Sequence, residues 1–263
     1  MKKLSLLFVL QLFVTCLCSQ SSVDKGKTLY EAKKYPEAEK LLKAVAEKTS
    51  DYAAAQYYLG RIAFDKKEYD DAVDYFKTAT EGNAKEGDYF NWLGDTYAAI
   101  GSDAGFLKQM SVGPKAMKAW EKATGLDAKN ISARVFLAGA YLQAPGFMGG
   151  GADKAKVKAT EALKLLDEAL MKTPDNYQYQ YWYGKTAALN NLRLDEGEVH
   201  MKKYVNHTPQ GDEPPLANVY LRLAQIMEKK GNKTDAKKYY EMAWKKDSSL
   251  DEAKEGLERI AKK

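Results

Sequence analysis

Residues 57–80 read YYLGRIAFDKKEYDDAVDYFKTAT, and this stretch decides the fold. Two largely apolar segments are joined by the charged residues 65–68. Gly60 lies in the first segment and Ala72 lies 12 residues later in the second. Two antiparallel helices approach each other closely only where the side chains at their crossing are small, so this pair predicts a helical hairpin. The bulky Phe76 follows Ala72 by four residues, one helical turn along the same face.

The same pattern recurs along the chain. The pairs separated by 34 residues are Gly26 and Gly60, Gly60 and Gly94, Tyr35 and Tyr69, and Ala38 and Ala72. We count six units with small residues at the crossing, namely Gly26 with Ala38, Gly60 with Ala72, Gly94 with Ala116, Ala138 with Ala162, Gly184 with Gly197, and Ala224 with Ala236. A repeat of this length, built from helix pairs, predicts a solenoid.

Three segments carry a family resemblance: Tyr58-Leu59-Gly60, Trp92-Leu93-Gly94 and Trp182-Tyr183-Gly184. They resemble the first-helix signature of the tetratricopeptide-repeat (TPR) family. The resemblance covers residues 20–248 and implies an all-α solenoid of about six TPR-like helix pairs. Residues 249–263 are then expected to form a C-terminal capping helix that covers the apolar end of the stack.

Two units contain insertions. The first, near residues 101–113, is expected to hold a short extra helix, because Leu107 and Met110 are three residues apart. The second, near residues 144–153, is glycine-rich and lacks the Gly-Lys-Ser/Thr of a phosphate-binding loop, so we expect a flexible connection with Asp153 as the N-cap of the next helix.

Phe147 and Met148 stand at the centre of this second insertion. Apolar side chains at the tip of a loop favour burial against another molecule, so both are candidate partner contacts. The proline positions support the boundaries of the repeats, since all seven prolines fall between the expected helices, with Pro36 and Pro114 in the first turn of a second helix.

The N-terminus has the order of a secretory signal peptide. Lys2 and Lys3 precede an apolar run from Leu4 to Val14, and small or polar residues follow. The run is shorter than the roughly 20 residues that a membrane-spanning helix needs, so residues 1–19 are predicted to be removed, leaving no stable transmembrane span. Cleavage is expected near residues 18–20. A lipid on Cys16 or Cys18 is a weaker alternative, because the residues before each differ from those that lipidation sites prefer.

Composition narrows the classes of function. Removal of Lys2 and Lys3 would lower the formal charge from +5 to +3, which is a mixed surface rather than the basic footprint of a nucleic-acid binder. Both cysteines lie in the leader, and His200 and His207 are not spaced as metal ligands, so no metal site, cofactor or catalytic group is expected.

The resemblance also places a binding groove. In a TPR stack the first helices line the concave side, and the fifth and ninth positions of each face it, if the small residue is counted as the eighth. These positions hold Tyr57 and Arg61, Asn91 and Asp95, Val135 and Gly139, Tyr181 and Lys185, and Leu221 and Gln225. The candidate partner-binding residues among them are Tyr57, Arg61, Asn91, Asp95, Tyr181, Lys185 and Gln225.

The family's carboxylate clamp grips a peptide C-terminus with Lys, Asn and Arg at such positions. Asp95 would repel a carboxylate there, which disfavours binding of chaperone tails. The sequence therefore predicts an exported, non-enzymatic scaffold or adaptor that binds a protein or peptide in its concave groove, in the periplasm or cell envelope of a bacterium. The alternative is a glycan or small-ligand binder that uses a tyrosine-rich surface.

Overall fold

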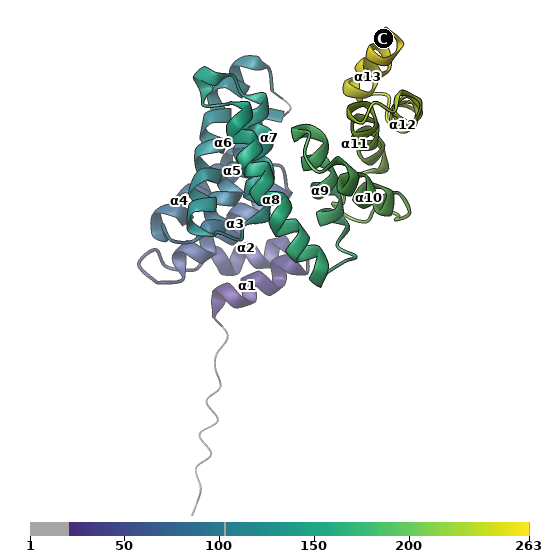
Figure 1. Cartoon of the computed structure of the whole chain (residues 1–263). Coiled ribbons are helices and arrows are strands. Elements are labelled where there is room, and N and C mark those ends of the chain that lie inside the picture. Colours follow the sequence, from purple (N-terminus) through teal and green to yellow (C-terminus); the bar gives the residue numbers. More distant parts are fainter. Residues whose placement is uncertain (1–20, 103, 263) are drawn as a thin grey trace, which may run out of the picture.

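The computed structural model describes residues 21–102 and 104–262, and these residues form α-helices and one short 3-10 helix, with no strand. The helices pack as consecutive pairs (Figure 1). The pairs are α1 (Ser22–Glu31) with α2 (Tyr35–Lys43), α3 (Tyr52–Asp65) with α4 (Tyr69–Gly82), α5 (Gly87–Ser102) with α6 (Phe106–Leu126), α7 (Ile131–Gln143) with α8 (Ala152–Lys172), α9 (Tyr177–Asn190) with α10 (Leu194–Val205), and α11 (Leu216–Lys229) with α12 (Lys233–Lys246). The predicted all-α solenoid of six helix pairs is thereby confirmed.

The small residues lie at the helix crossings, as the repeat pattern predicts. A Cβ added to Gly60 would come within 2.8 Å of the Phe76 ring, and one added to Gly94 within 2.6 Å of Trp120. Gly26 faces Leu42 and Gly184 faces Met201 in the same way. Each bulky residue thus fills a notch that only glycine leaves open, and this packing sets the distance between the two helices of a pair.

The last helix, α13 (Asp251–Ala261), follows α12 and packs on both helices of the sixth pair. Its Gly256 forms another notch, which the fully buried Tyr240 ring of α12 fills. Leu257 and Ile260 pack against the same apolar cluster. The expected terminal helix is therefore present and covers the apolar end of the stack.

Two expectations about the insertions are corrected. The first insertion has no separate short helix, because α6 runs without a break from Phe106 through Pro114, which lies inside the helix. Proline removes one backbone hydrogen bond there, and packing on both sides offsets that loss. Before the proline, Val112 is buried and lies close to Gly101 of α5, and after it Ala116 is buried as well.

The second insertion contains the 3-10 helix η1 (Gly146–Met148) and ends at α8. Gly151, not Asp153, is the N-cap of α8, with φ at 154°, a conformation that a side chain would strain. Asp153 lies in the first turn, where its charge interacts favourably with the helix dipole. The stretch Tyr177–Tyr183, which alternates like a strand in sequence, forms the start of α9.

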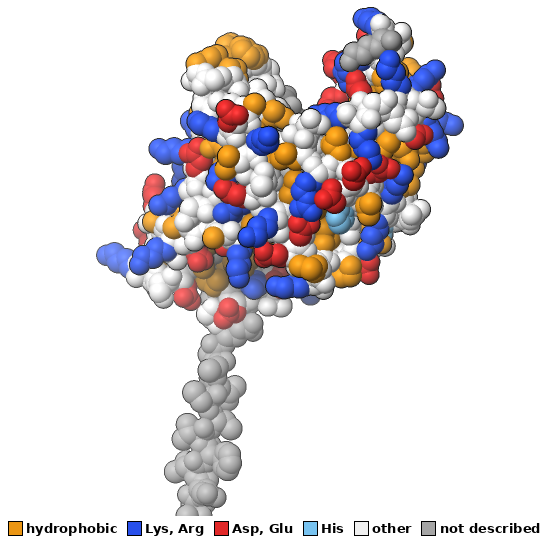
Figure 2. Space-filling view, in the orientation of Figure 1, with side chains coloured by type: hydrophobic (Ala, Val, Ile, Leu, Met, Phe, Trp, Pro, Cys, Tyr) orange, Lys and Arg blue, Asp and Glu red, His pale blue; other side chains and the backbone are white. Residues whose placement is uncertain are grey.

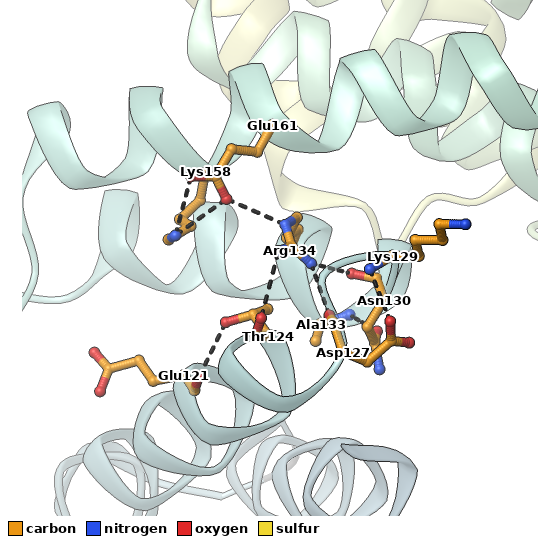
Figure 3. A network of polar contacts seen from close by, with 9 residues as sticks. All are labelled: Glu121, Thr124, Asp127, Lys129, Asn130, Ala133, Arg134, Lys158 and Glu161. Atoms are coloured by element: carbon orange, nitrogen blue, oxygen red, sulfur yellow. Dashed lines mark hydrogen bonds and ion pairs between the residues drawn. The ribbon is translucent and has the colours of Figure 1, made fainter. Parts of the chain in front are cut away.

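A buried arginine fixes α7 to its neighbours (Figure 3). Arg134, only 7% exposed, donates to the carbonyl oxygens of Thr124, Asp127 and Asn130 at the end of α6 and in the turn that follows. Its Nε lies 3.1 Å from Glu161 of α8. One guanidinium thus satisfies carbonyl groups that the end of a helix leaves unpaired, and it holds α6, α7 and α8 in register.

Candidate concave binding site

The first predicted groove residues, Tyr57 and Arg61, form an internal cluster on α3. Arg61 donates to the hydroxyl groups of Tyr57 at 2.9 Å and of Tyr30, on α1, at 2.8 Å. Its guanidinium also lies 3.7 Å from the centre of the Trp92 ring on α5, a cation–π contact. Tyr57 itself is 9% exposed. These contacts connect α1, α3 and α5, the first helices of three successive pairs. Both side chains therefore stabilise the packing of these helices and leave little surface open to a partner.

Asn91 and Asp95 lie one turn apart on α5 and bond to each other at 3.0 Å. Asp95 also accepts a hydrogen bond from the indole nitrogen of Trp120 at 2.7 Å. Burial raises the pKa of Asp95 to about 7, while the bonds from Trp120 and Asn91 and the charge of Arg61 oppose this rise. Both carboxylate oxygens of Asp95 therefore accept hydrogen bonds from within the chain, and the residue is only partly exposed to solvent.

Arg222 connects two further predicted residues, Tyr181 of α9 and Gln225 of α11, and the charges of Arg222 and Glu252 act on the neighbouring Lys185. Arg222, which the sequence analysis did not single out, donates to Gln225 at 2.8 Å and to Glu252 of α13 at 3.0 Å. Burial lowers the pKa of Lys185 to about 8; the charge of Arg222 acts in the same direction and that of Glu252 opposes it.

A cavity of about 690 Å³ opens between α5, α6, α7 and α9. Its walls include the predicted groove positions Val135, Gly139 and Lys185. Most of the other lining side chains are apolar, among them Met110, Met117, Trp120, Phe136, Leu189 and Met148. Ligand sites are typically concave and apolar with a few polar groups, so this cavity is the strongest candidate binding site in the described part of the chain.

Both insertions contribute to one side of this cavity. Phe106 and Met110 come from the first insertion, and Pro145 and Met148 come from the second. Met148 lies beside Gly113 of α6, at 3.8 Å from a Cβ built there, so the two insertions are in contact. The sequence showed the insertions but not that they meet, because their contact depends on how far α6 and α7 extend beyond the rest of the stack.

The outer end of this region carries exposed apolar side chains. Phe106 is 68%, Leu107 81% and Phe147 78% exposed. Figure 2 shows hydrophobic side chains gathered at one projecting end of the molecule, with a hollow beside it. Figure 1 places the beginning of α6 and the end of α7 there. Of the two predicted loop contacts, Phe147 is therefore open to solvent, and Met148 is partly buried and lines the cavity.

The cavity wall contains several residues that the sequence analysis missed. Met117 and Trp120 of α6 belong to a second helix, whereas the prediction considered only first helices. Leu189 and Asn190 lie one turn beyond Lys185 and Thr186 on α9. The i, i+4 spacing from Lys185 to Leu189 is a sequence signal that could have extended the predicted groove.

Two regions of the chain match sequence profiles described as tetratricopeptide repeat, at residues 23–88 and 218–249. No curated protein matches the sequence. Within the described residues no helix is long and apolar enough to cross a bilayer, and no group of three or more His, Cys, Asp or Glu side chains could hold a metal ion.

Several solved structures share the fold, two of which are described as TPR proteins. A thermophilic TPR protein of Thermus thermophilus aligns at a TM-score of 0.53 and 18% identity, over 80% of this chain and 98% of its own. PilW, described as a widely conserved type IV pilus biogenesis factor, aligns at 0.54 and 15%, over 90% and 96%. YrrB, described as a TPR protein with an unusual peptide-binding site, aligns at 0.51 and 17%, over 82% and 96%. The profile matches and the fold together support the TPR family for this chain.

Proposed function

We propose that this protein is an exported TPR scaffold or adaptor that binds an extended segment of a partner protein in the cavity between α5, α6, α7 and α9. The observation that carries this proposal is the cavity itself, whose apolar wall continues onto exposed Phe106 and Phe147. Apolar surface in a concave site favours binding because burial removes it from water.

The fold is compatible with this role. Proteins built from TPR units are generally non-enzymatic scaffolds, and the neighbours of similar fold include one described with a peptide-binding site and one described as a pilus biogenesis factor. Export is proposed from the leader pattern of residues 1–19, which lies outside the described residues. The bacterial envelope is the location we propose on the same basis.

The alternative, a glycan or small-ligand site on a tyrosine-rich surface, has less support. Eight of the described tyrosines are buried: Tyr57, Tyr89, Tyr141, Tyr181, Tyr183, Tyr204, Tyr220 and Tyr240. Rings of this set pack against neighbouring aromatic side chains of the stack. An aromatic platform needs an open ring face, and these rings do not offer one.

Two glycines allow a matched test of the cavity. A Cβ at Gly139 of α7 or at Gly125 of α6 meets no other atom within 4 Å, but only Gly139 lines the cavity. Gly139→Phe should fill the cavity, whereas Gly125→Phe adds the same side chain elsewhere. We expect partners recovered with the tagged protein from envelope extract to be lost with Gly139→Phe and kept with Gly125→Phe, at similar melting temperatures. Equal recovery with both variants would move the binding site out of the cavity.

A further inference from the structure

The two most exposed large hydrophobic side chains of the described residues belong to the insertions. Leu107, in the first turn of α6, is 81% exposed, and Phe147, in η1, is 78% exposed. Neither lines the cavity, so a segment bound there does not account for them. They lie at the projecting end of the molecule in Figure 2 and together form its apolar tip. Exposed apolar surface of this kind marks a contact with another protein or with a membrane.

Backbone hydrogen bonds hold Phe147 at this tip. The N–H of Met148 donates to the carbonyl oxygen of Pro145 at 2.9 Å, which closes the turn η1. The N–H of Gly151 donates to the carbonyl oxygen of Tyr141 at 2.8 Å, which ties the loop to α7. The apolar tip is therefore formed before anything binds to it, and little conformational freedom is lost when it is buried.

Positive charge is concentrated around the apolar tip. In the sequence, residues 101–118 and 144–158 contain six lysines and two aspartates, a formal charge of +4. The rest of residues 20–263 sum to −1. Five of the six lysines are exposed, namely Lys108, Lys115, Lys118, Lys154 and Lys156. An anionic surface is therefore attracted to the end of the molecule that carries the tip.

Two of these lysines lie next to the apolar side chains. Lys108 directly follows Leu107 in the first turn of α6. The ammonium group of Lys154 lies 3.1 Å from the carbonyl oxygen of Gly149, in the loop that holds Phe147. Apolar side chains flanked by lysines suit the boundary of a bilayer, where the side chains enter the acyl region and the ammonium groups stay at the phosphates.

We propose that the apolar tip inserts into the headgroup region of a bilayer that contains anionic lipid, with the flanking lysines paired with lipid phosphates. A second copy of the chain fits less well, because contact between two tips would bring like charges together. Phe106, which precedes Leu107, lines the cavity, so the cavity would open beside the membrane. This inference goes beyond the proposed function and does not depend on what the cavity binds.

The test uses the protein from residue 20 onwards, which contains every described helix. The leader is left out so that its apolar run does not contribute to lipid binding. Sedimentation with vesicles of phosphatidylcholine that contain about a quarter phosphatidylglycerol measures binding to an anionic bilayer. We expect binding to these vesicles to be at least about tenfold stronger than to vesicles of phosphatidylcholine alone.

Matched variants assign the binding to the apolar tip. The double change Leu107→Gln, Phe147→Gln removes both apolar side chains and leaves the charge unchanged. The control, Met171→Gln with Val199→Gln, alters side chains that are 77% and 65% exposed, at the other end of α8 and on α10. We expect the tip variant to bind anionic vesicles at least about tenfold more weakly and the control to bind as the unchanged protein does.

A fluorescent label distinguishes insertion from adsorption by charge alone. Both cysteines of the sequence precede residue 20, so Phe147→Cys provides a single thiol for an environment-sensitive dye. Emission of the dye should shift to the blue when anionic vesicles are added. The same dye attached after Val199→Cys should show no shift.

Two results would overturn this inference and leave the proposed function standing. One is equal binding of the unchanged protein and the tip variant to anionic vesicles, including no binding by either. The other is an unshifted dye at position 147. If the tip variant instead lost the partners recovered from envelope extract while no vesicles were bound, the tip would be a protein contact and not a membrane contact.

Discussion

The carboxyl group of Asp95 lies in surroundings that favour its protonated form. Its pKa is raised from 3.8 to about 7, chiefly by burial, although Trp120 and Asn91 donate to it. Between pH 3.8 and about 7, the folded protein therefore keeps the proton of Asp95, whereas the unfolded chain has lost it. Unfolding free energy should then fall as pH rises through this interval, by at most about 1.4 kcal/mol per pH unit for one proton.

We predict that Asp95→Asn removes this part of the pH dependence. The asparagine oxygen can still accept the Trp120 indole hydrogen, so the change removes the titrating group without removing that bond. Urea unfolding between pH 4.5 and 8 gives the free energy of unfolding of both proteins. The difference, Asp95→Asn minus the unchanged protein, should increase as the pH rises. A difference that does not vary with pH would mean that Asp95 titrates as an exposed carboxyl does.

Pairs of helices are held at close distance by bulky side chains that enter glycine notches. Phe76 against Gly60 and Trp120 against Gly94 are two examples from adjacent units. Glycine lowers intrinsic helix stability, so its presence in the middle of these helices is explained by packing rather than by propensity. The same reasoning marks Gly139, where an added Cβ would meet nothing, as a position where glycine serves no packing purpose within the chain.

Alanine substitutions at these two kinds of glycine should have opposite effects. Gly60→Ala places a methyl group within 2.8 Å of the Phe76 ring, and overpacking of this kind typically costs about 1–3 kcal/mol. Gly139→Ala should instead stabilise the protein by roughly 0.5–1 kcal/mol, because alanine is the better helix former. Chemical denaturation of the two variants provides the measurement. Destabilisation of similar size in both would contradict the assigned helix crossings.

At the scale of the whole molecule, Ser21 caps the first described helix and α13 covers the C-terminal end of the stack. Ser21 caps α1, because its hydroxyl accepts from the Asp24 backbone N–H at 3.1 Å and its own N–H donates to the Asp24 carboxylate. This reciprocal pair is a capping box, and loss of such a cap costs typically about 1 kcal/mol. The first helix of the solenoid therefore depends on a residue that closely follows the expected leader.

This dependence sharpens the expectation for processing. The mature chain should begin at Ser19, Gln20 or Ser21, since a start at Ser22 would remove the cap of α1. N-terminal sequencing of the exported protein would show the first residue. Recovery of Met1, or a lipid attached to Cys16 or Cys18, would contradict removal of the leader.

The sequence by itself determined the repeat. Crossing residues such as Ala38 and Ala72 are buried, and Gly60 meets Phe76 as its position relative to Ala72 predicts. Such predictions succeed because the helix period and the need for small residues at a close crossing are local properties of the chain. Helix boundaries near the insertions were less predictable. Proline disfavours the interior of a helix, but packing on α5 keeps Pro114 inside α6.

The site was decided by the tertiary structure. Sequence position places Tyr57, Asn91 and Tyr181 on the side of the first helices that faces the groove, but contacts between successive units bury them. Conversely, the cavity lies between α5, α6, α7 and α9. In the sequence, the whole of α8 separates α7 from α9. Only the superhelical stacking of the units brings Lys185 beside Val135 and Gly139, because that arrangement depends on contacts between repeats and not on the pattern within one.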